Sequence, residues 1–338
     1  MRKQALVTAI VLVAAVAHAA APDDALVDEG SQKLQAGDVA GALQLFDRAQ
    51  KQAPRDPRPH YLAGVALQKR NDGVGAEREL RAALMLDPKL PEVRNELGAL
   101  LNERRRFADA VVELKRAVAE KPDLAEAWFN LGQAALATKD CATSLAAYAR
   151  ATKLAPSDSD GYISQSVAAR RCKKLDVATQ SARMAVKLAA SNPATHLNLG
   201  LTLEANGKLD DAVAEYTLAT RIKPDYATAW WSLGLCEIQR KKPDAAIVAL
   251  EKARTLSPTA ARIADLGVAY RDKGDLKRAQ SLFAEALAKD PRYVPAHWHL
   301  AQVLSAQHQC GELRKELAKL PPDDAQSAAA RKLTSECK

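Results

Sequence analysis

Residues 125–158 read AEAWFNLGQAALATKDCATSLAAYARATKLAPSD, and the markers of this stretch recur along the chain at intervals of 34 residues. Its closing proline belongs to the series Pro54, Pro88, Pro122, Pro156, Pro224 and Pro258. Its glycine belongs to the series Gly30, Gly64, Gly98, Gly132, Gly200 and Gly234. The proline series is interrupted once, at Ala190. Self-similarity at a fixed period predicts a repeat architecture.

Each repeat is expected to form two antiparallel helices. Small residues at fixed positions let helix axes approach closely. Proline ends the second helix, because it lacks the amide hydrogen that would continue it. Turns such as Ala36-Gly37-Asp38 join the two helices, with Gly37 in the left-handed conformation and Asp38 capping the next helix. One repeat buries too little to fold alone, so stability comes from the array.

The repeats resemble the tetratricopeptide repeat, because Trp128, Leu131 and Gly132 match its Trp-x-x-Leu-Gly pattern, as do Trp230, Leu233 and Gly234. The resemblance implies an all-α, right-handed superhelical solenoid of stacked helix-turn-helix repeats. We expect an array of about nine repeats over residues 20–321, followed by a capping helix at 322–338. The repeats are 23–56, 57–90, 91–124, 125–158, 159–192, 193–226, 227–259, 260–293 and a partial one at 294–321. The pattern departs most around the fourth and fifth repeats, at Ser144, Ser166 and Ala182.

The first residues have the features of a secretory signal peptide. Arg2 and Lys3 precede an apolar run that ends near Ala17, and the small triplet Ala17-His18-Ala19 follows. We predict a signal peptide at residues 1–19 and a periplasmic mature protein. An uncleaved membrane anchor is the alternative, although the run is shorter than the ~20 residues that a spanning helix needs. Any other membrane association is expected to be indirect.

Basic residues cluster where the first helix of a repeat meets its turn, in a chain of net charge +8. Stacking would align them along one edge, and the set is Arg104, Arg105, Arg106, Arg170, Arg171, Arg240, Lys241 and Lys242. This basic edge would suit an anionic partner in the envelope. The alternative is that cations near a helix C-terminus simply favour the helix dipole. Nucleic acid is not an expected partner, because an exported protein seldom meets it.

Five cysteines in an exported chain can oxidise. Cys141 and Cys172 take positions of neighbouring repeats that lie near the same end, and Cys310 and Cys337 copy this relation with a shorter spacing. We therefore predict two disulfides, Cys141–Cys172 and Cys310–Cys337, each contributing ~3 to 4 kcal/mol on the loop-entropy model. The second would hold the C-terminal segment across the end of the array. Cys236 is expected to be a buried apolar residue.

Catalytic signatures are missing from the sequence: it has no GxSxG, no GxxxxGK[ST], no HExxH and no glycine-rich dinucleotide fingerprint. His297, His299, His308 and Cys310 lie close together in the sequence but lack a recognised ligand spacing. We therefore predict that the protein is not an enzyme and needs no cofactor or metal.

The resemblance implies that positions two, five, six, nine, twelve and thirteen of each repeat, here called the groove positions, line a concave groove. The predicted ligand-binding residues are Tyr61, Asn95, Phe129, Asn130, Gln133, Leu197, Asn198, Leu201, Trp231, Leu235 and Trp298. Their apolar members favour an apolar or amphipathic segment. Asn130 and Asn198 belong to a polar row that could bond a peptide backbone. The alternative is that some of these side chains pack in the core. The family's lysine clamp for C-terminal carboxylates is not expected, because the required lysine is missing.

Two classes of function follow. In the first, the protein is an envelope scaffold that holds a polypeptide segment within an assembly, secretion, pilus or motility complex. In the second, it is an adaptor whose basic edge binds an anionic polysaccharide, a lipid head group or an acidic protein. Salt distinguishes them, because binding at a basic edge weakens steeply as ionic strength rises. The residues do not name the partner.

Overall fold

A computed structural model of the chain describes residues 24–325 and 327–337. The predicted signal peptide at residues 1–19 lies outside this range. The chain divides into two compact units, Met1–Cys172 and Lys173–Lys338. The boundary falls between the two helices of the fifth predicted repeat, in the region where the sequence pattern departs most.

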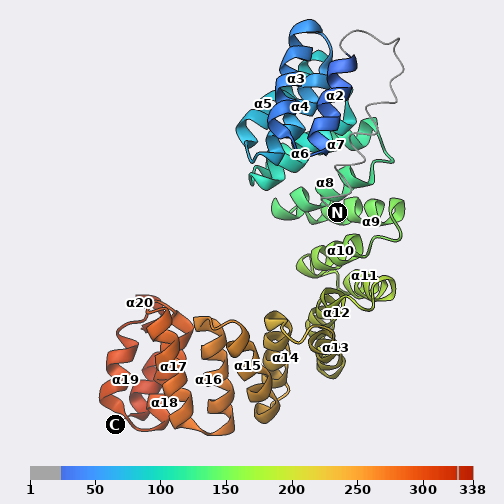
Figure 1. The fold of residues 1–338 in the computed structure, drawn as a ribbon. Coiled ribbons are helices and arrows are strands. Elements are labelled where there is room, and N and C mark those ends of the chain that lie inside the picture. The colour runs from blue at the N-terminus through green and yellow to red at the C-terminus, as the bar shows by residue number, and fades with distance from the viewer. Residues whose placement is uncertain (1–23, 326, 338) are drawn as a thin grey trace. The chain divides into compact units, whose positions relative to one another are not determined.

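The first unit is described from Asp24 onward as a series of helices (Figure 1). They are α2 (Asp24–Gln35), α3 (Val39–Gln52), α4 (Pro57–Lys69), α5 (Gly73–Leu86), α6 (Pro91–Glu103), α7 (Phe107–Glu120), α8 (Ala125–Ala137), α9 (Cys141–Leu154) and α10 (Ser159–Arg171). From α2 to α9, the two helices of a repeat pack on each other, and the second packs on the first helix of the next repeat.

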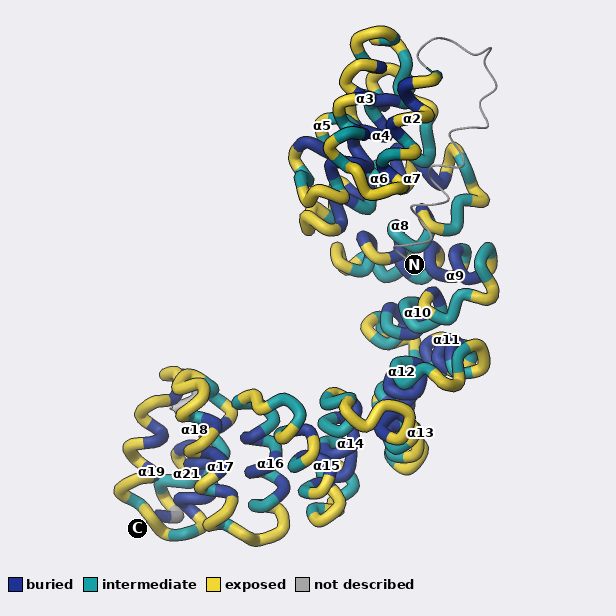
Figure 2. Tube along the Cα trace, viewed as in Figure 1, coloured by how far each residue is buried: buried dark blue, intermediate teal, exposed yellow. Residues whose placement is uncertain are grey.

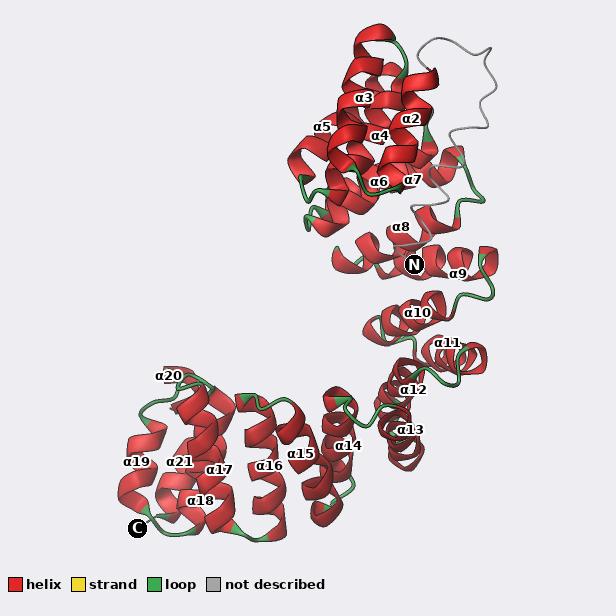
Figure 3. Cartoon of the chain, viewed as in Figure 1, coloured by secondary structure: helices red, strands yellow, loops and turns green. Residues whose placement is uncertain are grey.

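The second unit continues in the same way. It contains α11 (Leu175–Leu188), α12 (Pro193–Ala205), α13 (Leu209–Ile222), α14 (Ala227–Gln239), α15 (Pro243–Leu256), α16 (Ala260–Lys273), α17 (Leu276–Lys289), α18 (Val294–Ala306), α19 (Cys310–Leu317), α20 (Pro322–Ala325) and α21 (Ala328–Glu336). Residues 24–325 and 327–337 contain no strand (Figure 3). The predicted all-α fold of helix-turn-helix repeats is therefore confirmed.

Within each unit, buried residues follow the helices and exposed residues gather at the turns (Figure 2). The recurring glycine explains how closely the two helices of a repeat approach. A Cβ atom added at Gly200 would lie 2.5 Å from Cε1 of Tyr216, whose side chain is fully buried. The large side chain of the second helix thus fills the space that the glycine leaves open, which is why the two residues keep a constant spacing.

The turns between paired helices depend on one residue in the left-handed conformation. Gly37 and Gly274 have φ values of 88° and 92°, as expected for glycine in such a turn. Asp38 and Asp275 follow them and accept hydrogen bonds from Gly41 N and Arg278 N. In other turns a residue other than glycine adopts the same conformation, with φ between 56° and 63°. These residues are Asn71, Arg105, Lys139, Lys173, Lys241 and His308.

The fourth residue of several repeats joins its helix to the preceding repeat. Trp128 Nε1 donates to the backbone oxygen of Pro122 at 2.9 Å, and Trp230 Nε1 donates to that of Pro224 at 2.9 Å. The tryptophan of the repeat pattern is thus structural. Its hydrogen bond satisfies a carbonyl where proline has ended a helix.

The C-terminal cap differs from the single helix that we predicted for residues 322–338. It consists of α20 and α21, and α21 begins after Ser327, whose Oγ accepts from Ala330 N at 3.1 Å. This N-cap starts a new helix and explains the interruption. Ala330 and Cys337 are buried in the core of the second unit, so α21 covers the face of the last repeat that has no following repeat to bury it.

Candidate functional site

The predicted ligand-binding residues all lie on first helices of repeats: α4, α6 and α8 in the first unit, and α12, α14 and α18 in the second. Their exposure differs. Tyr61, Asn95, Leu197 and Asn198 are buried, whereas Gln133 is exposed. The half-buried ones are Phe129, Asn130, Leu201, Trp231, Leu235 and Trp298. The half-buried group is therefore the part of the set that can both pack and contact a ligand.

Trp231 is held within the second unit. Its Nε1 donates to Asp265 Oδ2 on α16 at 2.7 Å, and the guanidinium of Arg262 lies 5.6 Å from its ring centroid. Burial raises the pKa of Asp265. Removing Trp231 would therefore leave the half-buried carboxylate of Asp265 without its donor, so Trp231 stabilises the fold as well as contributing apolar surface.

A pocket of about 350 Å³ lies beside Trp298 in the second unit. Its walls are mostly apolar, and they come from α18 and from the segment that leads into and begins the cap: Val294, Pro295, Trp298, His299, Leu320, Ser327 and Ala329. The Cys310–Cys337 disulfide joins the start of α19 to the end of α21. The sequence indicated Trp298 but not the pocket, because the pocket needs the cap to fold back over α18.

Asn198 carries an unusual buried amide. The residue is 4% exposed, and neither its Nδ2 nor its Oδ1 has a hydrogen-bond partner. Leaving such groups unpaired costs ~1 to 3 kcal/mol, and both atoms are closed to solvent in this structure. Asn130, by contrast, already donates from Nδ2 to Asn95 Oδ1 at 2.9 Å.

The groove positions of the first unit combine an aromatic side chain with carboxylates. Phe129 packs edge-on against Tyr148, with ring centroids 5.5 Å apart. Carboxylates occupy several groove positions of α6 and α8, at Glu92, Glu96, Glu103 and Glu126. Burial, followed by the charges of Glu126 and Glu103, raises the pKa of Glu96 to about 7. The signal for this cluster was present in the sequence, as glutamates at positions two, six and thirteen of adjacent repeats.

Several members of the basic edge are engaged in ion pairs. Arg104 and Arg106 both contact Glu77, and Arg106 also contacts Asp109. Arg240 pairs with Glu237 at 2.9 Å and with Asp210. Arg105, Arg171, Lys241 and Lys242 are exposed, and Arg170 is half-buried. For the paired arginines, the helix-end explanation accounts for the charge without an anionic partner.

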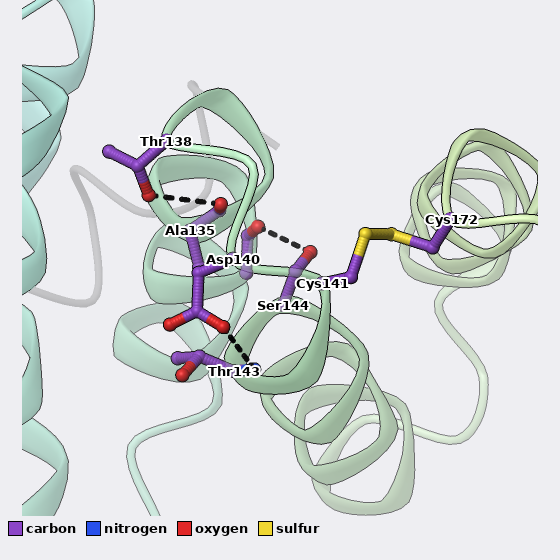
Figure 4. Close-up of a disulfide and its surroundings, with 8 residues drawn as sticks. Ala135, Thr138, Asp140, Cys141, Thr143, Ser144 and Cys172 are labelled. Carbon is purple, nitrogen blue, oxygen red and sulfur yellow. Dashed lines mark hydrogen bonds between the residues drawn. A yellow bond between two sulfur atoms is a disulfide. The ribbon is translucent and has the colours of Figure 1, made fainter.

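The structure contains both predicted disulfides. Figure 4 shows Cys141, the first residue of α9, joined to Cys172 at the end of α10. Cys310 and Cys337 hold the same two positions at the cap, as the matching spacing indicated. Cys236 is fully buried, and burial followed by nearby carboxylates raises the pKa of its thiol to about 12.

Two models of the tetratricopeptide repeat match the sequence. One covers residues 95–159, 170–227 and 197–261, and the other covers residues 33–100 and 270–337. The chain belongs to the tetratricopeptide repeat family. This fold is typical of scaffolds for protein–protein interaction.

Solved structures of other tetratricopeptide repeat proteins share this fold. The Cut9-Hcn1 hetero-tetramer of the APC/C has a TM-score of 0.56 and 17% identity, covering 87% of this chain and 59% of that chain. A repeat protein from Parabacteroides merdae has a TM-score of 0.58 and 15% identity, covering 73% and 98%. Pseudomonas aeruginosa pilF has a TM-score of 0.54 and 20% identity, covering 64% and 97%. No curated protein matches the sequence.

Other kinds of site are not evident within the part of the chain that the structure describes. It contains no group of three His, Cys, Asp or Glu residues that could hold a metal ion. His297 is occupied, because its ring contacts Glu316 and lies 3.0 Å from the backbone oxygen of Pro291. Over residues 24–325 and 327–337, no helix has the length and apolar character needed to cross a bilayer.

Proposed function

We propose that this protein is a non-enzymatic scaffold of the bacterial cell envelope. Its groove positions hold an apolar or amphipathic polypeptide segment, as part of an assembly, secretion, pilus or motility complex. The predicted signal peptide and the paired cysteines support an oxidising compartment outside the cytoplasm. The repeat fold supports a binding role.

The pocket beside Trp298 carries this proposal. A pocket of about 350 Å³ is at the small end of ligand sites and suits one or two apolar side chains. The Trp298 ring supplies a large apolar surface. Tryptophan is common among the few residues that contribute most of the binding energy of an interface. Since its indole Nε1 has no hydrogen-bond partner within the described residues, it can also bond a backbone carbonyl of a bound segment.

The proposal does not extend to the basic edge. Arg104, Arg106 and Arg240 already neutralise carboxylates of their own unit, so a ligand anion would compete with existing ion pairs. An adaptor that acts through this edge would depend on the exposed side chains outside these ion pairs, which are Arg105, Arg171, Lys241 and Lys242.

Site-specific photocrosslinking tests the pocket. A photoreactive phenylalanine analogue replaces Trp298 in the full chain, and the matched control places it at Val248, which is 69% exposed on a second helix. We expect a polypeptide adduct from native envelopes at position 298 but not at 248, and we expect it to persist in 1 M NaCl, since apolar contacts are not screened. An equal adduct at both positions, or none at position 298, would contradict the proposal.

A further inference from the structure

A second aromatic ring, that of His299, borders the pocket beside Trp298. His299 follows Trp298 on α18, and both residues line the pocket. One face of the imidazole is covered, because it stacks on the buried ring of Phe283 with the ring centroids 5.7 Å apart. The imidazole therefore meets the pocket through its other face and its edges. What it offers a ligand there depends on which ring nitrogen carries the hydrogen.

A neighbour on α16 fixes the position of that hydrogen. Arg271 Nη1 lies 3.1 Å from His299 Nδ1 and donates to Gln302 Oε1 at 2.6 Å. A guanidinium has only donors, so Nδ1 accepts from it and cannot itself carry a hydrogen. The 3.1 Å contact between Nδ1 and Gln302 Oε1 is then a contact between two acceptors that share the same donor, Arg271.

The ring itself is neutral. Burial lowers the pKa of His299, and the charge of Arg271 acts in the same direction. A neutral imidazole has one hydrogen, and because Nδ1 accepts from Arg271 that hydrogen is on Nε2. His299 is therefore held as a hydrogen-bond donor at Nε2.

The side chains that line the pocket offer donors rather than acceptors. His299 Nε2 and Trp298 Nε1 have no hydrogen-bond partner among residues 24–325 and 327–337, and neither atom is closed to solvent. The remaining polar side chain of the lining is Ser327, whose Oγ already accepts from Ala330 N at 3.1 Å. A ligand that fits this pocket must therefore bring hydrogen-bond acceptors.

The charges around His299 favour a neutral acceptor. Arg271 pairs with Asp272 at 2.9 Å, so its charge needs no anion from a ligand. Lysine and arginine side chains have only donors and would leave those of the pocket unpaired. A backbone carbonyl has two lone pairs and no hydrogen, which matches the site. Carbonyls in the interior of a helix already accept hydrogen bonds, so the matching part of a ligand is not helical.

We propose that His299 is a specificity-determining residue of this pocket, where its Nε2–H and the Nε1–H of Trp298 donate to backbone carbonyls next to a bound apolar side chain. Arg271 is a positioning residue that keeps the hydrogen on Nε2. The partner is a polypeptide segment that is extended where an apolar residue enters the pocket, and lysine or arginine is rejected at that place. The inference rests on the proposed function and specifies the kind of segment that the pocket binds.

Long-range proton–nitrogen NMR of the full chain tests the role of Arg271. In the wild type we expect the Nδ1 signal of His299 to be that of a nitrogen without hydrogen. Arg271→Met should move hydrogen toward Nδ1, where Gln302 Oε1 can accept it. The matched control Lys277→Met removes an exposed cation of the same unit and should leave the ring unchanged. A wild-type ring with its hydrogen on Nδ1, or an unchanged ring in Arg271→Met, overturns this role.

Binding of N-acetyl-L-leucine amide, a neutral apolar residue with a carbonyl on each side, tests the pocket. A probe of this size should have a Kd on the order of millimolar, followed by the indole N–H signal of Trp298. His299→Phe keeps a ring but removes the donor, and it should weaken binding about tenfold, as loss of one neutral hydrogen bond does. His299→Gln is the matched control, because its amide can accept from Arg271 and still donate, so the affinity should stay within about threefold.

N-acetyl-L-lysine amide has the same carbonyls and should bind the wild type about tenfold more weakly than the leucine probe. Equal binding of the leucine probe by the wild type and His299→Phe, equal losses in the phenylalanine and glutamine variants, or equal binding of the two probes overturns the inference. So does a Trp298 signal that the leucine probe does not shift. If these measurements fail while position 298 still crosslinks a polypeptide, only this inference is lost. If crosslinking fails as well, the proposed function is lost too.

Discussion

The imidazole of His196 lies between two oxygen atoms, 2.7 Å from Glu215 Oε2 and 2.9 Å from the backbone oxygen of Ala190. His297 contacts Glu316 and Pro291 in the same way, and Arg94 contacts Glu113 and Pro88. In every case the pair is 19 residues apart in the sequence. Where tryptophan takes the first position, alanine takes the second: Trp128 with Ala147, and Trp230 with Ala249.

Other repeats have a Trp–Ala pair where this repeat has His196 and Glu215. We therefore predict that a double substitution restores the stability that each single substitution loses. His196→Trp alone leaves the half-buried carboxylate of Glu215 without a partner, and Glu215→Ala alone leaves Nδ1 of the imidazole without one, so each should destabilise by about 2 kcal/mol. The double variant His196→Trp/Glu215→Ala reproduces the other repeats and should lie within about 0.5 kcal/mol of the wild type. Denaturant unfolding measures all three. Strictly additive losses would show that the two residues do not act as a pair.

The left-handed turn residues give a second prediction. Lys241 is exposed and has a φ of 58°, a conformation that costs a residue with a side chain ~1 kcal/mol or more. Lys241→Gly should therefore raise stability by about 1 kcal/mol, and the mirror substitution Gly207→Lys, at φ 73°, should lower it by a similar amount. Thermal unfolding checks both. A loss of stability in Lys241→Gly would mean that the lysine makes a contact that offsets its strain.

The Cys310–Cys337 disulfide should be needed to keep the pocket beside Trp298 formed, because it holds α21 against the last repeat. Cys310 and Cys337 are 27 residues apart, and a loop of that length contributes ~3.5 kcal/mol on the loop-entropy model. Replacing both by serine should speed amide hydrogen exchange in α21 and reduce crosslinking from position 298. The matched variant, Cys141→Ser/Cys172→Ser, removes a similar loop of 31 residues in the other unit and should leave exchange in α21 unchanged. Equal exchange of α21 in the two variants would contradict this dependence.

Glu96 should make stability fall as pH rises. Its pKa is raised to about 7, so the folded state favours the protonated form, and stability decreases as pH climbs from the unfolded value of about 4.5 past 7. Glu96→Gln removes this loss: it should match the wild type near pH 4 and exceed it by about 2 kcal/mol at pH 8, after allowing for partial exposure. Chemical unfolding at the two pH values provides the measurement. A variant less stable than the wild type at pH 8 would rule out an unpaired carboxylate.

Much of the candidate site could be read from repeat position, but its chemistry could not. Position numbers placed Trp231 and Trp298 on first helices, yet they did not show that Trp231 is bonded to Asp265 while Trp298 borders a pocket. The predicted ligand-binding residues also left out Glu96 and Glu126, because the charge of a glutamate depends on its burial and on the charges near it.

The sequence by itself determined the repeat, the helix pairs and the partners of the cysteines. A fixed period converts sequence spacing into spatial position, because each repeat packs on the next in the same way. Only the tertiary structure decided which side chains make contacts within the protein and which can contact a ligand. That distinction depends on contacts between residues far apart in the chain, such as Asn102 with Asn130 and the cap with Trp298. Burial determines the free-energy cost of leaving a polar group without a hydrogen-bond partner. The repeat period does not indicate how deeply a single side chain is buried.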